Sequence, residues 1–572
     1  MKPLISFKNF TFKYDLQKNP TLKNINLEIF PGEKVLIVGP SGSGKSTIGQ
    51  CLNGILPHLY KGTSTGELTI SGLPFGASIA ELSSQVSTIL QDTDGQFIGL
   101  TVAEDVAFAL ENDECELSVM RETVEHWSEV TELSALLTKH PQDLSGGQKQ
   151  RVTLAGVLVD ESPILLFDEP LANLDPQACR DTMALIRRIH EENQVTTIVI
   201  EHRIEEVLPL GIDKVVVVND GEIVAVGHPD ELLRTVVFEE NGLREPLYLT
   251  ALKSAHVSSL LPDFSKLENL DKEPSKVALA TFVSENRRVD KLVSTDKILS
   301  VRDLSVAFDE HEVLRGINLD VFEGERISIV GKNGVGKSTF ANSLCQFVRS
   351  SGEVFYRGKS VSTDTIAERA GRIGYIMQNP NLMISQNIVV DEVAFGLRLR
   401  QVDEAVITDK VEKILKVCGL FPFRNWPISS LSYGQKKRVT IASILVLEPE
   451  ILLLDEPTAA QDLRSYREIM DFLCELNQRL NLTMIMITHD MYLITEYTDR
   501  TLVFADGKIV ADQAPSEVLA SEELLSLGNL TQTSLYELAD RVELDPVALT
   551  EAFISRQKTV SADKEVLNIE GN

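Results

Sequence analysis

The sequence predicts two tandem α/β domains of the P-loop nucleotide-binding class, each built on a mainly parallel sheet. The first observation is a repeat, because residues 144–151 read LSGGQKQR and residues 431–438 read LSYGQKKR. The second is the pair of apolar runs PILLFDEP and EILLLDEP, which alternate with helical stretches. Strands that are apolar on both faces indicate a parallel sheet covered by helices on both sides. The third is a glycine-rich loop that follows an apolar strand in each half.

The repeat has a constant register over most of each half. Asp168 and Asp455 are 287 positions apart (455 − 168), and so are His202 and His489 (489 − 202). Lys45 and Lys337 are 292 apart (337 − 45), so the second copy is five residues shorter (292 − 287) between these points. We interpret the chain as a tandem duplication, with the shortening in a loop.

The repeat divides the chain into four predicted segments. They are a first domain at 1–235, a connector at 236–297, a second domain at 298–520 and a short helical tail at 521–572. Each domain is expected to have a β-rich N-terminal part and a helical part. The connector contains nine Lys/Arg and ten Asp/Glu, with three prolines, which predicts a partly ordered small insert. The tail is predicted to form two short helices around Pro546, with a disordered polar end.

The composition limits the function classes. A net charge of −29 argues against nucleic acid as a main partner, because binding to phosphate backbones normally needs a basic face. The apolar runs are too short to cross a bilayer, so any membrane association is expected to come through a partner. Six scattered cysteines, with no CxxC pair, are typical of buried thiols in a reducing compartment.

The segments GPSGSGKST (39–47) and GKNGVGKST (331–339) both satisfy the P-loop pattern. Glycines let backbone N–H groups surround phosphates, the lysine reaches the β- and γ-phosphates, and the following serine binds Mg²⁺. The predicted nucleotide contacts are Gly39, Ser41, Gly42, Gly44, Lys45, Ser46 and Thr47 in the first half, and Gly331, Asn333, Gly334, Gly336, Lys337, Ser338 and Thr339 in the second.

An acidic pair ends an apolar strand in each half, Asp168-Glu169 and Asp455-Glu456. Ligands bind at the carboxyl edge of such sheets. One carboxylate of each pair is suited to hold Mg²⁺, and the next is suited to polarise an attacking water. The sequence therefore predicts a nucleotide-binding unit with a Mg²⁺ site in each half.

The LSGGQ phrase resembles the signature of the ATP-binding cassette (ABC) family, and the resemblance covers nearly the whole of both halves. It implies that each signature begins a helix whose N-terminus points at the γ-phosphate of ATP held by the other half. Ser432 and Gly434 would then close over the ATP at Lys45. Ser145 and Gly147 would close over the ATP at Lys337, so the two cassettes pair within the chain.

The resemblance also assigns roles to single residues. Gln91 and Gln378 match the glutamine that contacts Mg²⁺ and senses the membrane partner, and His202 and His489 match the switch histidine at the γ-phosphate. Tyr14 and Phe308 match the aromatic residue that stacks on adenine, and Asp175 and Asp462 match the D-loop. The implied Mg²⁺ ligands are Ser46, Gln91 and Asp168 in one site and Ser338, Gln378 and Asp455 in the other. The implied catalytic residues are Glu169, Glu456, His202 and His489.

The segments after the two glutamines contain TVAEDVAF and VVDEVAF. This pattern resembles energy-coupling-factor (ECF) and cobalt-type importers, which implies an integral membrane coupling subunit, a separate substrate-capture membrane subunit and a place on the cytoplasmic face of the membrane. The expected cargo is a vitamin, a vitamin precursor or a metal ion. Two alternatives stay open: a soluble ABC-F-like translation factor, disfavoured by the acidic charge and balanced connector, and a fused sugar-type importer ATPase, disfavoured by two complete cassettes.

Tyr433 stands where the first copy has Gly146. Either its side chain points aside without effect, or it makes the two sites unequal. Only a positive φ at this position would exclude a tyrosine.

Overall fold

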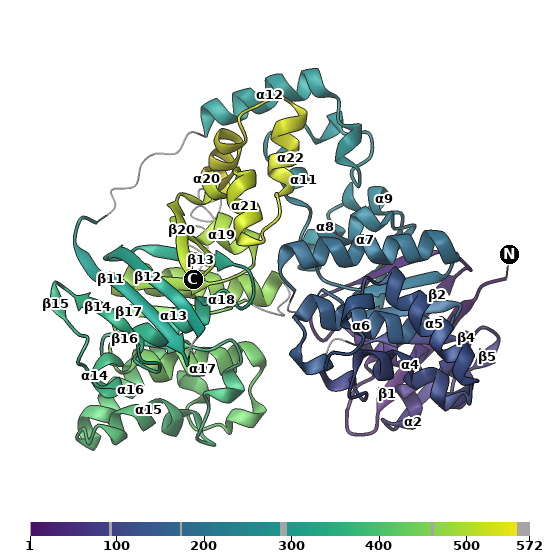
Figure 1. Cartoon of the computed structure of the whole chain (residues 1–572), viewed down its shortest axis with the longest axis horizontal. Coiled ribbons are helices and arrows are strands. Elements are labelled where there is room, and N and C mark those ends of the chain that lie inside the picture. Colours follow the sequence, from purple (N-terminus) through teal and green to yellow (C-terminus); the bar gives the residue numbers. More distant parts are fainter. Residues whose placement is uncertain are drawn as a thin grey trace. The chain divides into compact units, whose positions relative to one another are not determined.

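The computed structural model describes residues 2–90, 94–171, 174–286, 294–309, 311–458 and 463–557 (Figure 1). Gln91, Asp462 and the polar end of the tail lie outside the described residues. The chain forms two compact units, one of Met1–Lys253 with Ser258–Leu270, and another that takes most of the chain from Asp271 onward. Within the described residues, none of the helices has the length and apolar character needed to cross a bilayer.

The first unit contains two sheets. The antiparallel sheet has the order β2-β1-β4-β5 and is made of β1 (Ile5–Tyr14), β2 (Leu22–Ile29), β4 (Gly62–Ile70) and β5 (Leu73–Pro74). The larger sheet has the order β10-β9-β3-β8-β7-β6 and is made of β3 (Lys34–Val38), β6 (Val86–Ile89), β7 (Ile164–Asp168), β8 (Thr196–Ile200), β9 (Lys214–Asn219) and β10 (Glu222–Gly227). All its pairings are parallel except that of β10 with β9, so the predicted mainly parallel sheet is confirmed.

Helices complete the first cassette. They are α1 (Lys45–Leu52), α2 (Ile55–His58), α3 (Ile79–Ser83), α4 (Val102–Asn112), α5 (Leu117–Val130), α6 (Gly146–Leu158), α7 (Pro176–Asn193), α8 (Ile204–Val207) and α9 (Pro229–Leu233). The core lies between the two sheets, where Phe7, Phe10 and Phe12 of β1 join Ile37 of β3 and Ile198 of β8 in one buried cluster. β8 is buried along its whole length, which is why its sequence TTIVI shows no polar face.

The second unit repeats this plan. Its antiparallel sheet has the order β12-β11-β14-β15, from β11 (Lys297–Phe308), β12 (His311–Phe322), β14 (Ser351–Tyr356) and β15 (Lys359–Ser360). The larger sheet has the order β16-β17-β18-β13-β19-β20, from β13 (Arg326–Gly331), β16 (Ile373–Ile376), β17 (Ile451–Asp455), β18 (Thr483–Ile487), β19 (Arg500–Ala505) and β20 (Lys508–Gln513). Its helices are α13 (Lys337–Leu344), α14 (Ile366–Arg369), α15 (Val389–Leu399), α16 (Glu404–Val417), α17 (Tyr433–Leu445), α18 (Leu463–Leu480), α19 (Met491–Tyr497) and α20 (Pro515–Leu519).

The connector is ordered in two parts. Its first part contains α10 (Val237–Glu240) and α11 (Leu247–Ser254), and the Leu247 N–H donates to Oε2 of Glu205 in the first cassette (3.0 Å). Its second part is α12 (Lys272–Glu285), which lies beside the tail helix α22 (Ser534–Arg541) in Figure 1. The tail also contains α21 (Glu522–Gly528) and helical residues 546–557.

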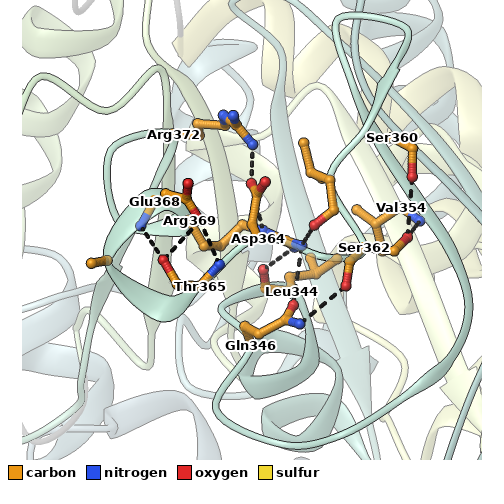
Figure 2. Close-up of polar contacts among 12 residues, drawn as sticks. Leu344, Gln346, Val354, Ser360, Ser362, Asp364, Thr365, Glu368, Arg369 and Arg372 are labelled. Carbon is orange, nitrogen blue, oxygen red and sulfur yellow. Dashed lines mark hydrogen bonds and ion pairs between the residues drawn. The ribbon is translucent and has the colours of Figure 1, made fainter.

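A buried arginine fixes the far end of the phosphate-loop helix in the second cassette (Figure 2). Arg369 is 1% exposed, and its Nη1 donates to the carbonyl of Leu344, the last residue of α13, at 2.7 Å. Its Nη2 donates to Oε1 of Gln346 (3.1 Å) and to the carbonyl of Val361. The matching residue of the first cassette, 287 positions earlier, is the buried Leu82. The two cassettes therefore support the same helix with different chemistry.

We expect Arg369→Met to destabilise the second cassette. The substitution leaves the buried carbonyls of Leu344 and Val361 without this donor, at a cost of about 1–3 kcal/mol each. The unfolding temperature of that cassette, followed by calorimetry on the full chain, should fall by about 5 °C or more.

The control is Arg398→Met, which removes an arginine of the same cassette that pairs with Asp391 at the surface (3.0 Å). A partly exposed pair of this kind contributes about 1 kcal/mol or less. Equal shifts for the two variants would contradict the assigned role of Arg369.

Candidate nucleotide site

Each phosphate loop holds its lysine at its centre. Lys45 is buried, and its Nζ donates to the carbonyls of Gly39 (2.8 Å) and Pro40 (2.9 Å). Lys337 is equally buried and donates to the carbonyls of Gly331 (2.6 Å) and Lys332 (3.0 Å). The ammonium groups therefore lie where the backbone curls around them, as a phosphate-binding loop requires.

The residue before each lysine must be glycine. Gly44 has φ 106° and Gly336 has φ 107°, both in the left-handed region that side chains disfavour. A Cβ at Gly44 would lie 2.9 Å from Leu22 Cδ2, and one at Gly336 would lie 2.7 Å from Leu314 Cδ2. The turn that starts α1 and α13 is thus closed to larger residues.

The predicted Mg²⁺ ligands come together in pairs. The Ser46 hydroxyl lies 3.5 Å from Asp168 Oδ1, and the Ser338 hydroxyl lies 3.3 Å from Asp455 Oδ2. A hydroxyl next to a carboxylate is a hard oxygen set of the kind Mg²⁺ prefers, so these residues fit the ion. Burial and the charge of Glu169 raise the pKa of Asp168 to about 6.

The two glutamates share a strained backbone conformation. Glu169 has φ 52° and Glu456 has φ 45°, which is unfavourable for residues other than glycine. The N–H of Glu169 donates to the carbonyl of Ile200, and the N–H of Glu456 to that of Ile487, both at 2.9 Å. These bonds to the next strand hold the turn in both cassettes.

The histidines differ in how closely they approach these glutamates. In the first cassette Nε2 of His202 lies 2.7 Å from Glu169 Oε1, while Nδ1 lies 3.2 Å from the Gly39 carbonyl. In the second cassette Nε2 of His489 lies 3.7 Å from Glu456 Oε1, which is beyond hydrogen-bond distance. The first cassette therefore links the phosphate loop, the histidine and the glutamate directly.

The electrostatics of the two glutamates also differ. Burial acts to raise the pKa of Glu169, but the hydrogen bond from His202 and the charge of Lys45 outweigh it and hold the pKa below its usual value. Burial and the charge of Asp455 raise the pKa of Glu456 to about 8. The same residue in the two cassettes thus has two different environments.

Both signature phrases start a helix through a capping box. The Ser145 hydroxyl accepts from the Gln148 N–H at 3.4 Å, and the Gln148 side chain accepts from the Ser145 N–H at 3.0 Å. Ser432 and Gln435 repeat both bonds at 3.3 and 3.0 Å. Serine and glutamine in this phrase therefore have a local structural role, which leaves the glycines to be explained.

The signature glycines are not required by the fold. Gly147 and Gly434 both lie in the first turn of their helices, without a positive φ. A Cβ at Gly434 would meet nothing within 4 Å, and one at Gly147 would lie 3.6 Å from Ala178 Cβ, an ordinary contact. Glycine lowers helix stability here, and the packing of the cassette gives no reason for it.

Tyr433 is compatible with its position. Neither it nor Gly146 has a positive φ, so the one condition that would exclude a tyrosine is absent at both residues. Its hydroxyl donates to the carbonyl of Gln378 in the same cassette at 3.3 Å, and its side chain is partly exposed. The tyrosine thus connects the start of α17 to the backbone of Gln378, just after β16.

The remaining predicted residues are placed around the phosphate loops. The Tyr14 hydroxyl donates to Gln50 Oε1 (2.9 Å) and lies 3.3 Å from the Thr47 hydroxyl, next to the first loop. Phe308 ends β11 and is half exposed. Exposed positions are also found for Ser41, Gly42, Asn333, Gly334 and Gln378, whereas Thr339 is half-buried.

Two contributors were missed from the sequence. The hydroxyl of Tyr375, on β16, donates to Asp455 Oδ2 at 2.8 Å. Glu201, the residue before His202, accepts from the His202 N–H (2.8 Å) and from the Leu171 N–H (3.0 Å). The available signal was that Glu201 sits inside the strand-end phrase TTIVIEH, where a buried carboxylate needs a partner.

Comparison with protein families gives two matches. A family model described as ABC transporter matches residues 22–172 and 314–459. A model described as ATP-binding cassette cobalt transporter matches residues 235–305, which is the connector and the start of β11.

The chain is also similar to curated proteins over nearly its full length. A protein of Streptococcus mutans is 54% identical over 560 residues, covering 97% of this chain and 99% of its own. One of Enterococcus faecalis is 51% identical, covering 98% and 99%. Both carry the provisional name ABC transporter ATP-binding protein. A solved structure from Clostridium perfringens, cbiO1, described as part of the ABC transporter complex cbiONQ, is 34% identical, covers 43% of this chain and 99% of its own, and has a TM-score of 0.38.

We expect Gly434→Ala to stabilise the chain slightly and to lower its ATP turnover. Alanine should gain about 0.5 kcal/mol in the helix, because its Cβ meets nothing within 4 Å. If a phosphate approaches this backbone, the added methyl should reduce turnover by about tenfold. Thermal unfolding and steady-state turnover measure the two effects.

The control is Gly156→Ala in α6, where the new Cβ would lie 3.6 Å from the Asp105 carbonyl oxygen, an ordinary contact. This variant should gain stability without losing turnover. Full turnover in Gly434→Ala would show that the glycine is not near the nucleotide.

Proposed function

The chain belongs to the ABC transporter ATP-binding protein family, and we propose that it is the ATP-hydrolysing subunit of an ECF- or cobalt-type membrane importer. Members of this family bind ATP and are ATPases. The observation that carries the proposal is the placement of the two glutamates, each near a phosphate-loop lysine and a histidine at the same sheet edge. The match of the connector to the cobalt-transporter model supports the choice of branch.

In the proposed reaction each glutamate acts as the general base. Glu169 or Glu456 accepts a proton from the attacking water as the water oxygen bonds to the γ-phosphorus and the bond to the β,γ-bridging oxygen breaks. Lys45 and Lys337 hold the phosphates, and His202 and His489 orient the glutamate and the γ-phosphate. ADP and inorganic phosphate are the products.

Mg²⁺ is the expected cofactor, and the paired hydroxyl and carboxylate groups described above fit it. Ser46 and Asp168 would hold one ion and Ser338 and Asp455 the other, with Gln378 as a further ligand and Gln91, outside the described residues, in the matching role. When bound, the ion neutralises charge on the β- and γ-phosphate oxygens. The chain's own residues position that ion and the water.

We propose further that the two cassettes pair, so that Ser432 and Gly434 serve the site of Lys45, and Ser145 and Gly147 serve the site of Lys337. The support is that the fold gives no reason for glycine at 147 or 434, while a helix N-terminus is suited to an anion. The covalent connection raises the effective concentration of each half for the other.

The proposed membrane partner is an integral coupling subunit whose helices dock on the helical part of each cassette. Exposed apolar side chains gather in the sequence after the glutamine segments, and Phe108 and Phe395 recur at the repeat spacing (395 − 108 = 287) with 37% exposure each. The larger set is Ile98, Leu100 and Phe108 in the first cassette and Leu382, Phe395 and Leu399 in the second. A separate membrane subunit would capture the substrate. The chain itself would lie on the cytoplasmic face of the membrane, bound through these membrane subunits.

The proposed cargo class is a vitamin, a vitamin precursor or a metal ion. The connector match to a cobalt-transporter model weighs against the ABC-F-like translation factor and the sugar-type importer. Nucleic acid is not proposed as a partner, because the chain carries a net charge of −29.

We expect Glu169→Gln and Glu456→Gln each to lower ATP turnover, and the double variant to lose it by about 100-fold or more, because a positioned base contributes roughly 10²–10⁴-fold. Phosphate release by the purified chain measures this.

The matched controls are Glu161→Gln and Glu448→Gln. These glutamates are also 287 positions apart (448 − 161), have φ of 49° and 58°, and are exposed. Their substitution should leave turnover unchanged. A double variant at 169 and 456 with normal turnover would exclude the proposed bases.

We also expect the chain, purified gently from membranes, to bring an integral membrane protein with it. Phe108→Asp combined with Phe395→Asp should abolish this association, because charge is costly in an apolar contact. The control is Leu16→Asp, which changes a fully exposed leucine outside the helical part. Recovery with ribosomes and without a membrane protein would overturn the transport proposal.

A further inference from the structure

The charges around the two glutamates are permuted between the cassettes. At three positions related by the repeat, the first cassette has Gln150, Glu201 and Arg203, and the second has Lys437, Thr488 and Asp490 (each 287 later). Both sets contain one cation, one anion and one neutral residue. The cation has moved from the segment after the histidine to the signature helix.

Lys437 contacts the backbone of the turn that contains Glu456. Its side chain is 1% exposed, and its Nζ donates to the carbonyl of Pro457 and lies 3.5 Å from the carbonyl of Glu456. Both carbonyls belong to the turn that holds Glu456 at φ 45°. Burial lowers the pKa of Lys437 to about 8, and the charges of Glu456 and Asp455 act to raise it.

The first cassette supports its turn differently. Gln150, on α6, donates through its neutral side-chain amide to the carbonyl of Pro170, and its Oε1 accepts from the Thr182 hydroxyl at 3.4 Å. The cation of this cassette is Arg203, next to His202, and its guanidinium contacts Cys179 Sγ at 3.5 Å. The segment reaches the glutamate through His202, whose Nε2 lies 2.7 Å from Glu169 Oε1. The Glu201 carboxylate accepts the Arg203 N–H at 3.3 Å. The positive charge in the first cassette thus lies on residues 201–203, here called the switch segment. It does not lie on the signature helix α6.

In the second cassette the matching segment, residues 488–490, has no arginine. Asp490 replaces the arginine, and its carboxylate caps α19 by accepting from the N–H groups of Tyr492 (2.9 Å) and Leu493 (3.3 Å). Its negative charge acts to raise the pKa of Glu456. In this cassette the cation that contacts the glutamate turn is therefore Lys437, on the signature helix α17.

We propose that the two ATP sites are unequal because Lys437 positions Glu456 from the signature helix of its own cassette, whereas Glu169 is positioned from the switch segment that carries Glu201 and Arg203. Lys437 is a positioning residue, since it contacts the backbone of the glutamate turn. A displacement of α17 would then act on Glu456 through the contact of Lys437, and a displacement of α6 would act on the Glu169 turn through the neutral amide of Gln150. This inference rests on the proposed role of the glutamates as bases.

The test measures each site alone. In a Glu169→Gln background, where Glu456 is the remaining base, Lys437→Met removes both charge and donor at similar length. We expect kcat to fall by about 10–100-fold, because small misplacements of a catalytic group have effects of this size. KM for ATP should change less than about twofold, because Lys437 contacts carbonyls of the glutamate turn and not the phosphate loop.

Conservative variants separate charge from packing. Lys437→Arg should recover kcat to within about threefold, since it keeps the charge and the donors. Lys437→Gln, which copies the first cassette, should stay at least about fivefold low, because the switch segment here has Asp490 in place of an arginine. The matched control is Gln150→Met in a Glu456→Gln background, where kcat should fall less than about threefold.

Each outcome is decisive. Normal kcat in folded Lys437→Met, a change confined to KM, or an equal loss in Gln150→Met would overturn the inference. If Lys437→Met does not fold, as shown by thermal unfolding and ATP binding, equal kcat values for the Arg and Gln variants would overturn it. Normal turnover in the double Glu169→Gln, Glu456→Gln variant would instead refute the proposed bases.

Discussion

The active geometry depends on three adjacent parallel strands that end at the same edge of a sheet. In the first cassette β3 leads into the phosphate loop, β7 into the acidic pair and β8 into the histidine, and the sheet order places β8 between the other two. His202 therefore reaches Gly39 with one ring nitrogen and Glu169 with the other. Parallel pairing of buried strands is the constraint that brings together residues more than 100 positions apart (169 − 39 = 130).

That constraint explains which parts of the site could be predicted from the sequence. The lysine, serine, acidic pair and histidine follow apolar strands, so their types and spacing are enough to indicate one shared sheet edge. The left-handed conformation of Glu169 and Glu456 could not be predicted, because nothing in DEP marks a positive φ. It is maintained by a bond to the neighbouring strand, which is a tertiary contact.

The buried charged residues that support the site's backbone could not be predicted from the sequence either. Lys437 and Arg369 are charged residues that are almost fully buried, and a sequence pattern assigns such residues to the surface. Each donates to backbone carbonyls, whose positions depend on the folded loops and helix ends around them. The fold class, in contrast, follows from the repeat, the apolar strands and the glycine-rich loops, and the mainly parallel sheets confirm it in both halves.

Duplication within one chain allows this kind of divergence. A cassette that pairs with copies of itself must keep both halves of every site compatible, whereas a fused cassette always has the same partner. A buried lysine is costly unless its charge is matched, so the change from Gln150 to Lys437 needs a compensating change nearby. The exchange of Arg203 for Asp490 and of Glu201 for Thr488 supplies one, since the summed charge of the three positions is zero in both cassettes. The two halves thus keep the same fold and the same local charge balance while placing the positive charge on different elements.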